Sequence, residues 1–180
     1  MIELYTIGHS NTSTDDFLKL LKQNNIAVLV DVRSSPYSKY VPHFSKRNLE
    51  GFIISSGLDY RYAGAYLGGM PDNQSVYEVH DGKKRVNYLK LMQLETYQVG
   101  LKHLLQIIKE TEDGGVAIMC AEADPYHCHR HNLIIRSLLD TQHQIVNVDI
   151  DVKHILKDGS TAPVIAEAFD QHNMKQERLL

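Results

Sequence analysis

The sequence has no tryptophan, and only two cysteines and five prolines occur among its 180 residues. Two cysteines cannot build a disulfide framework, so we expect reduced thiols and a cytoplasmic protein. No apolar run approaches the ~20 residues of a membrane span. The longest run lies near Val116–Ala121, and no membrane partner is expected. The first residues, MIELYTIGHS, also lack the basic start and long apolar stretch of a signal peptide.

Charge of one sign is not in large excess either, because the net charge is −3 and the isoelectric point is near 6.3. This balance argues against a dedicated non-specific DNA-binding protein. The hydrophobic share of 43% and the charged share of 23% exclude bulk disorder. A chain of 180 residues is long enough for one domain with a substantial core.

The segment from Arg33 to Tyr66 departs from this average. It holds five basic and two acidic residues, a charge of +3, so the rest of the chain carries −6. It also contains five of the ten tyrosines. Basic residues interleaved with tyrosines can line a groove for phosphates and bases, but they also occur on ordinary solvated, loop-rich surfaces.

Apolar, β-branched runs alternate with amphipathic segments along the chain. Strands are expected at Leu4–Ile7, Ile26–Val30, Leu58–Tyr62, Val116–Ala121 and within Ile145–Leu156. Helices are expected after a cap at Ser13, from Ser45 to Ser56, from near Thr96 to Asp113, from near Cys128, and briefly after Pro163. The stretch from Gly64 to Asp81 is typical of a loop.

This alternation predicts an α/β fold with a mostly parallel sheet and helices on both faces. We expect a single α/β domain over residues 1–160, followed by a C-terminal helix and tail over 161–180. Ligands in such folds bind beyond the carboxyl ends of the strands. That rule selects three segments, which are His9-Ser10-Asn11, Asp31–Pro36 and Cys120–Arg130.

The segment from Cys120 to His131 is the densest in reactive side chains. A buried strand leads into it and a helix leaves it, so the helix N-terminus and Arg130 would favour a thiolate at Cys128. Cys128 is therefore a candidate nucleophile or redox group, and we expect its sulfur to be partly exposed toward a cleft. Cys120, within the apolar run, is expected to be buried and inert.

Anion binding and proton transfer would complete this site. Arg33 and Arg130 would hold an anion such as a phosphate, helped by the helix N-terminus. Glu122 or His9 would transfer protons as catalytic groups. The other residues expected at the anion are Ser10, Asn11, Asp31, Ser34 and His129. One shared cleft is expected for His9, Asp31, Arg33, Glu122 and Arg130.

A metal is the competing hypothesis. The C-x7-C-H-x-H spacing from Cys120 to His131 supplies soft and borderline ligands but matches no zinc module of usual spacing. No metal site is therefore predicted outright, and the fallback ligands are Cys120, Cys128 and His129. The sequence also contains no Walker loop, G-x-G-x-x-G or H-E-x-x-H motif.

Several collinear pieces together carry a resemblance to a known family. They are Thr6–Asn11, Leu29–Pro36, Pro42-His43-Phe44, Leu67-Gly68-Gly69, Met119–Glu122, Asp124-Pro125 and Cys128-His129-Arg130. With these pieces the chain resembles the domain of unknown function 488 family. The resemblance implies an α/β domain whose matched motifs meet at one site, and it supplies no reaction. Relative to that family, Gln142–Asp149 looks like an insertion.

Three functions remain open from the sequence. The first is a cytoplasmic α/β protein that binds a small anionic, phosphate-bearing ligand, and whether it is an enzyme stays open. The second is a nucleic-acid-binding module that uses the segment from Arg33 to Tyr66. The third is a metal-binding or redox protein built on Cys120, Cys128 and the nearby histidines. No particular cofactor or oligomeric state is implied.

Overall fold

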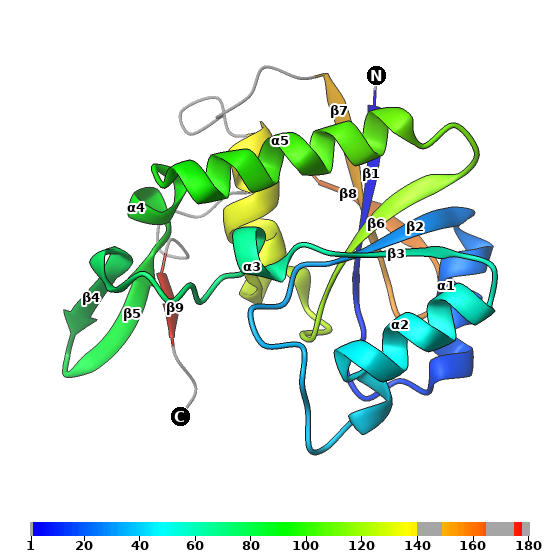
Figure 1. Ribbon diagram of the computed structural model, residues 1–180, viewed down its shortest axis with the longest axis horizontal. Helices are drawn as coiled ribbons and strands as arrows, with labels where there is room; N and C mark the ends of the chain where they lie inside the picture. The colour runs from blue at the N-terminus through cyan, green and yellow to red at the C-terminus, as the bar shows by residue number, and fades with distance from the viewer. Residues whose placement is uncertain (1, 140–148, 165–174, 178–180) are drawn as a thin grey trace.

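The computed structural model describes residues 2–139, 149–164 and 175–177, and its centre is a six-stranded sheet (Figure 1). The strand order is β3-β2-β6-β1-β7-β8, in which all pairs are parallel except β7 with β8. The strands are β1 (Ile2–Gly8), β2 (Ile26–Asp31), β3 (Asp59–Tyr62), β6 (Gly115–Cys120), β7 (Ile150–Ile155) and β8 (Thr161–Pro163). The predicted α/β fold with a mostly parallel sheet is therefore confirmed.

Helices cover both faces of the sheet (Figure 1). On one face, α1 (Thr14–Gln23) and α2 (Lys46–Ser55) pack their apolar stripes against the strands. On the other face lie α5 (Glu95–Glu110) and the helical segment from Arg130 to Leu139. The central strands β2 and β6 are thus buried on both sides, which explains why their sequences are continuous apolar runs.

The start of α1 shows how local sequence sets a helix boundary. The Ser13 hydroxyl accepts a hydrogen bond from the Asp16 backbone N–H at 3.1 Å and donates one to the Asp16 carboxylate at 2.8 Å. This reciprocal arrangement satisfies backbone groups that a helix start leaves unpaired. Ser45 occupies the corresponding position before α2, but its hydroxyl accepts from the Ser38 N–H at 3.5 Å instead.

The chain leaves β6 through a short turn, η3 (Pro125–His127), and then enters a buried helical segment. Its first part, η4 (Arg130–Ile135), has π-helical hydrogen bonding and continues into α6 (Arg136–Leu139). A π-helical turn is wider than an α-helical one and occurs frequently at functional sites. The helix predicted near Cys128 is confirmed, and the segment between β6 and this helix lies at the carboxyl edge of the sheet.

The expectation of a loop from Gly64 to Asp81 is wrong. That stretch contains α3 (Gly64–Leu67), η2 (Gln74–Val76) and β4 (Tyr77–His80), and β4 pairs antiparallel with β5 (Lys83–Asn87). Asp81 and Gly82 form the two-residue turn between β4 and β5, both with positive φ. The Asp-Gly pair is a strong hairpin signal. After β5 come α4 (Tyr88–Met92) and α5, while β9 (Lys175–Glu177) pairs with β5.

The C-terminal part is described in pieces. The strand expected within Ile145–Leu156 is β7, and residues 161–163 add β8 to its outer edge. The helix expected after Pro163 falls largely on residues 165–174, and the suspected insertion falls largely on residues 140–148. Both ranges lie outside the described residues.

Candidate functional site

Three parallel strands deliver the predicted site segments to one edge of the sheet. Gly8 at the end of β1 is in register with Cys120 at the end of β6, and Asp31 at the end of β2 is in register with Met119. The pairing continues past the strands, because the His9 N–H donates to the Cys120 carbonyl at 3.0 Å. The segments after β1, β2 and β6 are therefore neighbours, as the topology predicts.

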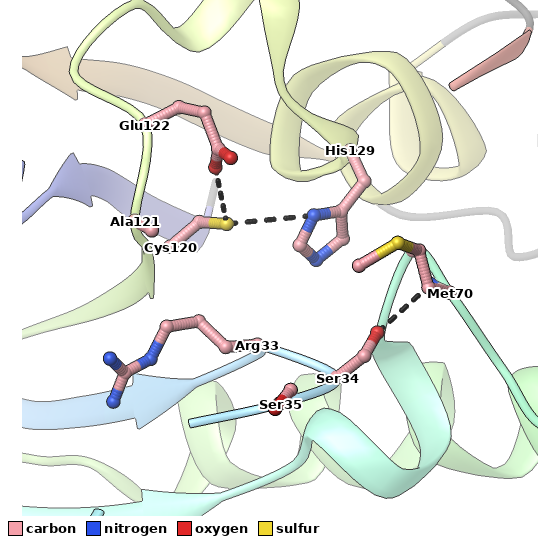
Figure 2. A pocket seen from close by; sticks show the side chains of 9 residues that line it. Arg33, Ser34, Ser35, Met70, Cys120, Ala121, Glu122 and His129 are labelled. Carbon is pink, nitrogen blue, oxygen red and sulfur yellow. Dashed lines mark hydrogen bonds between the residues drawn. The ribbon is translucent and has the colours of Figure 1, made fainter. Parts of the chain in front are cut away.

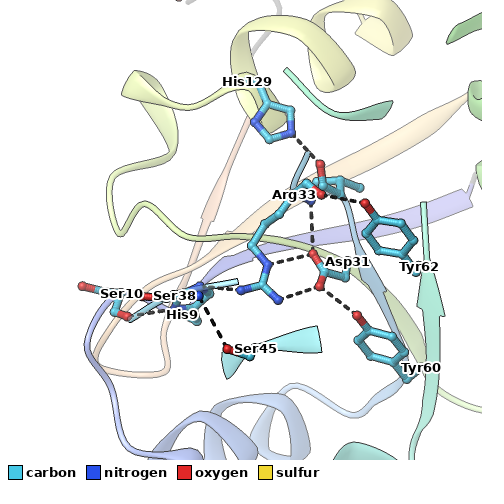
Figure 3. Close-up of polar contacts among 10 residues, drawn as sticks. His9, Ser10, Asp31, Arg33, Ser38, Ser45, Tyr60, Tyr62 and His129 are labelled. Carbon is cyan, nitrogen blue, oxygen red and sulfur yellow. Dashed lines mark hydrogen bonds and ion pairs between the residues drawn. The ribbon is translucent and has the colours of Figure 1, made fainter. Parts of the chain in front are cut away.

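Asp31 and Arg33 form a buried ion pair at this edge (Figure 3). The Arg33 guanidinium donates to both carboxylate oxygens of Asp31, from Nε at 2.9 Å and from Nη2 at 2.6 Å. The Tyr60 hydroxyl donates to the same carboxylate at 2.8 Å. Burial, together with the Asp31 charge, raises the pKa of Tyr60 well above its usual range. The positive charge of Arg33 is therefore compensated inside the protein.

His9 is held between Arg33 and the loop after β1. Its Nδ1 lies 2.8 Å from the Ser10 carbonyl, which can only accept, so Nδ1 carries the proton. Its Nε2 then accepts from Arg33 Nη1 at 3.1 Å, and the ring stacks on Phe44 with a centroid distance of 4.2 Å. Burial lowers the pKa of His9 to about 4, so the imidazole is neutral near pH 7.

Two cysteines, a histidine and a glutamate meet beside this ion pair. Figure 2 shows three of them, Cys120, Glu122 and His129. The sulfurs of Cys120 and Cys128 and a ring nitrogen of His129 all lie within 4.8 Å of one another, and we call these three residues the Cys2His cluster. The Glu122 carboxylate accepts from the Cys120 thiol at 3.0 Å and lies 3.5 Å from the Cys128 sulfur. The fallback metal ligands of the sequence are therefore the residues that converge.

The orientation of His129 is fixed by the backbone of the strand opposite (Figure 3). Its Nε2 donates to the Val32 carbonyl at 3.0 Å, so Nδ1 is the ring nitrogen that faces the two sulfurs. Nδ1 lies 3.6 Å from the Cys120 sulfur and 3.8 Å from the Cys128 sulfur. A histidine that donates one nitrogen to a backbone carbonyl and aims the other at a ligand site has the usual posture of a metal-binding histidine.

The two thiols have opposite acidities. The hydrogen bond with Cys128, together with burial, raises the pKa of the Cys120 thiol well above its usual range. Burial would also raise the pKa of Cys128, but the hydrogen bond with Cys120 and the neighbouring His129 and Arg130 lower it well below that range. Without a metal, the negative charge of the pair thus resides on Cys128.

Arg130 has a different setting from the one expected. Its guanidinium is buried and donates to the carbonyls of Glu122 at 2.7 Å and Ala123 at 3.1 Å, while Nε donates to the Thr6 hydroxyl at 3.3 Å. It does not line the pocket described below. In this structure it fastens the loop after β6 to β1, which positions Glu122 beside the two sulfurs.

A pocket of about 100 Å³ opens in front of the Cys2His cluster (Figure 2). The residues that line it are Arg33, Ser34, Ser35, Gly69, Met70, Cys120, Ala121, Glu122 and His129. The Met70 N–H donates to the Ser34 hydroxyl at 2.9 Å, which joins two of its walls. Gly68 lies so close to Ser34 that a larger residue would not fit there. A Cβ on Gly68 would lie 2.3 Å from the Ser34 hydroxyl oxygen.

The expected convergence is met in part. His9, Asp31 and Arg33 form one network, and Arg33 also lines the pocket together with Glu122. The expectation that the Cys128 sulfur is exposed is wrong, because the residue is 1% exposed and the helical segment covers it. Cys120 is buried as expected, yet it is the cysteine that lines the pocket.

Three further predicted residues have different surroundings. Ser34 lines the pocket, whereas Ser10 and Asn11 do not. The Ser10 hydroxyl donates to the Asn11 side chain at 3.4 Å, and Ser10 has a positive φ in the turn after β1. Their role at an anion stays a prediction.

Most of the basic, tyrosine-rich segment lies outside the pocket, because only Arg33, Ser34 and Ser35 of this segment line it. Tyr37 and Tyr40 are strongly exposed, and the Lys46 ammonium group sits 4.3 Å from the centre of the Tyr62 ring. None of these residues lines the pocket, and the same holds for Lys39 and Arg47. A nucleic-acid groove along this segment stays a prediction.

A second buried polar cluster was missed by sequence reasoning. His154 on β7 contacts the Thr6 hydroxyl at 2.7 Å and His131 at 3.2 Å, and the Tyr126 ring packs edge-on against both histidines. Burial lowers the pKa of His154 to about 3. Thr6 of β1 is paired in register with His154 of β7, a relationship that depends on strand pairing and that the sequence alone does not give.

Comparison with known proteins places the chain in a family. The sequence model of the family described as domain of unknown function DUF488 matches residues 13–136, and the chain belongs to that family. No match was found among curated proteins or among solved structures. Within the described ranges, none of the helices combines the length and the apolar character that crossing a membrane requires.

Proposed function

We propose that this protein binds a divalent transition-metal ion, in the first place Zn²⁺, through Cys120, Cys128 and His129. The mutual proximity of their three donor atoms, all within 4.8 Å, is the observation that carries the proposal. In a tetrahedral zinc site, bonds of about 2.3 Å to sulfur and about 2.0 Å to nitrogen put these atoms roughly 3.5 Å apart. The two sulfur-to-nitrogen distances of 3.6 and 3.8 Å are close to that value.

The chemistry of the donors also supports a metal. Thiolate sulfur and imidazole nitrogen are the ligands that zinc prefers in proteins. The low pKa of Cys128 supplies a thiolate before any ion arrives, and Cys120 would lose its proton on binding. The orientation of His129 already suits a ligand, since Val32 accepts the Nε2 proton and Nδ1 faces the two sulfurs.

The anion hypothesis has weaker support from the same geometry. Asp31 holds the Arg33 guanidinium through two hydrogen bonds, and two backbone carbonyls hold the Arg130 guanidinium. Asp31 thus compensates the charge of Arg33, and the N–H groups of Arg130 are directed at carbonyls and away from the pocket, which Arg130 does not line. An anionic ligand would have to displace one of these contacts.

Metal content after zinc loading and dialysis tests the proposal. We expect the wild-type protein to retain a single zinc ion per chain, measured by plasma mass spectrometry, and the Cys120→Ser and His129→Ala variants to lose it. His127→Ala is the matched control, because His127 lies in the same loop but is exposed and pairs with Asp124. Equal zinc retention in all four folded proteins, or none in the wild type, would refute the site.

A further inference from the structure

The two sulfurs of the Cys2His cluster lie near enough to react with each other. A hydrogen bond joins the Cys120 and Cys128 thiols, and the two sulfur atoms lie within 4.8 Å of each other. Seven residues separate the two cysteines in the sequence, so a bond between them closes only a short loop. The chain has no other cysteine, so each thiol has a single possible partner within the molecule.

The pocket gives a small reagent access to one of the two sulfurs. Cys120 lines the pocket, whereas Cys128 does not line it and is 1% exposed. Figure 2 shows the Cys120 sulfur between the Glu122 carboxylate and the His129 ring. A water molecule takes up about 30 Å³ of the liquid. A pocket of about 100 Å³ therefore admits a molecule of the size of hydrogen peroxide and excludes large reagents.

We propose that Cys120 and Cys128 form a reversible oxidation site, at which a hydroperoxide converts the two thiols into a disulfide and thereby releases the metal ion. The disulfide itself requires no metal, and only the release of the ion rests on the proposed metal site. Zinc binds thiolate sulfur, so a disulfide leaves His129 as the one remaining ligand of the cluster. A single histidine falls short of the three protein ligands that even an open zinc site has.

The reaction consumes one hydrogen peroxide for each disulfide. One sulfur takes a hydroxyl group from the peroxide and becomes a sulfenic acid, and the first water leaves. The other sulfur displaces that hydroxyl group as a second water, and the sulfur–sulfur bond forms. The thiols lose two electrons to the oxygen–oxygen bond, and their two protons leave in the water. From the metal-bound thiolates, the same bond changes release the ion and two hydroxide ions, and a thiol reductant restores both thiols by exchange.

Hydrogen peroxide added to the metal-free protein tests the disulfide. We expect mass spectrometry to show the loss of two hydrogen atoms, a peptide crosslink between Cys120 and Cys128, and full reversal by dithiothreitol. Cys120→Ser and Cys128→Ser should form no internal crosslink. The matched control is Met70→Leu, which removes another sulfur that lines the pocket and keeps a side chain of similar size. This control should form the crosslink to the same extent as the wild-type protein.

The same treatment of the zinc-loaded protein tests the consequence, and a chromogenic chelator should detect one zinc ion released for each disulfide formed. Thiols that stay reduced, or that are oxidised separately to sulfinic acids in the folded metal-free protein, would overturn the oxidation site. If that protein still retains zinc before treatment, the proposed metal site stands. A disulfide that forms while zinc is retained would overturn the release of the ion. A disulfide in a protein that never binds zinc would support the oxidation site and refute the metal site.

Discussion

The Arg33 guanidinium lies against the Asp31 carboxylate through two hydrogen bonds of 2.9 and 2.6 Å, and both side chains are buried. The two residues are separated by only Val32, whose carbonyl accepts from His129. The end of β2 therefore does two things at once. It cancels the charge of the arginine at the pocket, and it sets the orientation of the histidine in the Cys2His cluster.

Asp31→Asn should destabilise the protein strongly, because it leaves the Arg33 charge buried without its partner. Breaking a buried ion pair from one side costs about 3–5 kcal/mol. The matched control is Asp59→Asn, which removes the exposed pair with Arg61 and should cost less than about 1 kcal/mol. Urea unfolding of the two variants provides the comparison. Similar small losses in both would show that the Asp31–Arg33 pair is not buried as described.

Gly8→Ala should displace the loop after β6 and thereby weaken zinc binding at the Cys2His cluster, although Gly8 is not part of the cluster. A Cβ at this position would lie 1.9 Å from the Glu122 carbonyl oxygen, which also accepts from Arg130. The loop after β6 would have to move, at a cost of about 1–3 kcal/mol and with weaker zinc binding. Gly51→Ala is the control, since nothing lies within 4 Å of its added Cβ in α2. We expect this variant to gain roughly 0.5–1 kcal/mol, with zinc binding unchanged.

Much of the fold followed from local sequence, because strands buried on both faces leave long apolar runs such as Ile26–Val30. The hairpin of β4 and β5 was missed because its strands are largely exposed and lack that run, although Asp81-Gly82 marks its turn. The sequence could place a cysteine at a helix start. It could not show that the side chain turns inward, as that of Cys128 does.

The sequence also predicted some features of the candidate site and missed others. Topology brought Cys120, Cys128 and His129 to one edge, and residue type alone identified them as possible ligands. The contact between Arg130 and Thr6 was beyond sequence reasoning, because it joins two segments that lie far apart in the chain.

Alkylation of the thiols should be slow in the folded protein and slower still with zinc. Both cysteines are buried, and reactivity needs access as well as thiolate character. We expect iodoacetamide to label Cys120 and Cys128 at least about tenfold more slowly than in urea. Zinc should reduce the rate further, as followed by mass spectrometry. Labelling of Cys128 as fast as in urea, or labelling rates that are the same with and without zinc, would contradict the buried ligand cluster.

Stability of the metal-free protein should fall as the pH drops from 7 to 5. The folded pKa values of His9, about 4, and His154, about 3, lie below the usual 6.5. The unfolded chain therefore takes up protons first, so the stability from these groups is present above about pH 6.5 and is lost as the pH falls toward the folded values. Each histidine accounts for roughly 2 kcal/mol between pH 7 and 5.

Urea midpoints of protein kept in chelator, measured at both pH values, test this expectation. His154→Gln is the informative variant, because it removes one titrating group while keeping a polar side chain beside Thr6. Its midpoint should fall less between pH 7 and 5 than that of the wild-type protein. An equal fall in the two proteins would show that His154 is not the buried, neutral group described here.

The most direct test of the proposed centre is X-ray absorption at the zinc edge of the loaded wild-type protein. The Cys2His cluster predicts a four-coordinate shell with two sulfurs at about 2.3 Å and the remaining nitrogen and oxygen ligands at about 2.0–2.1 Å. A shell of nitrogen and oxygen ligands without sulfur would contradict the centre, because the ion would then be held elsewhere on the protein.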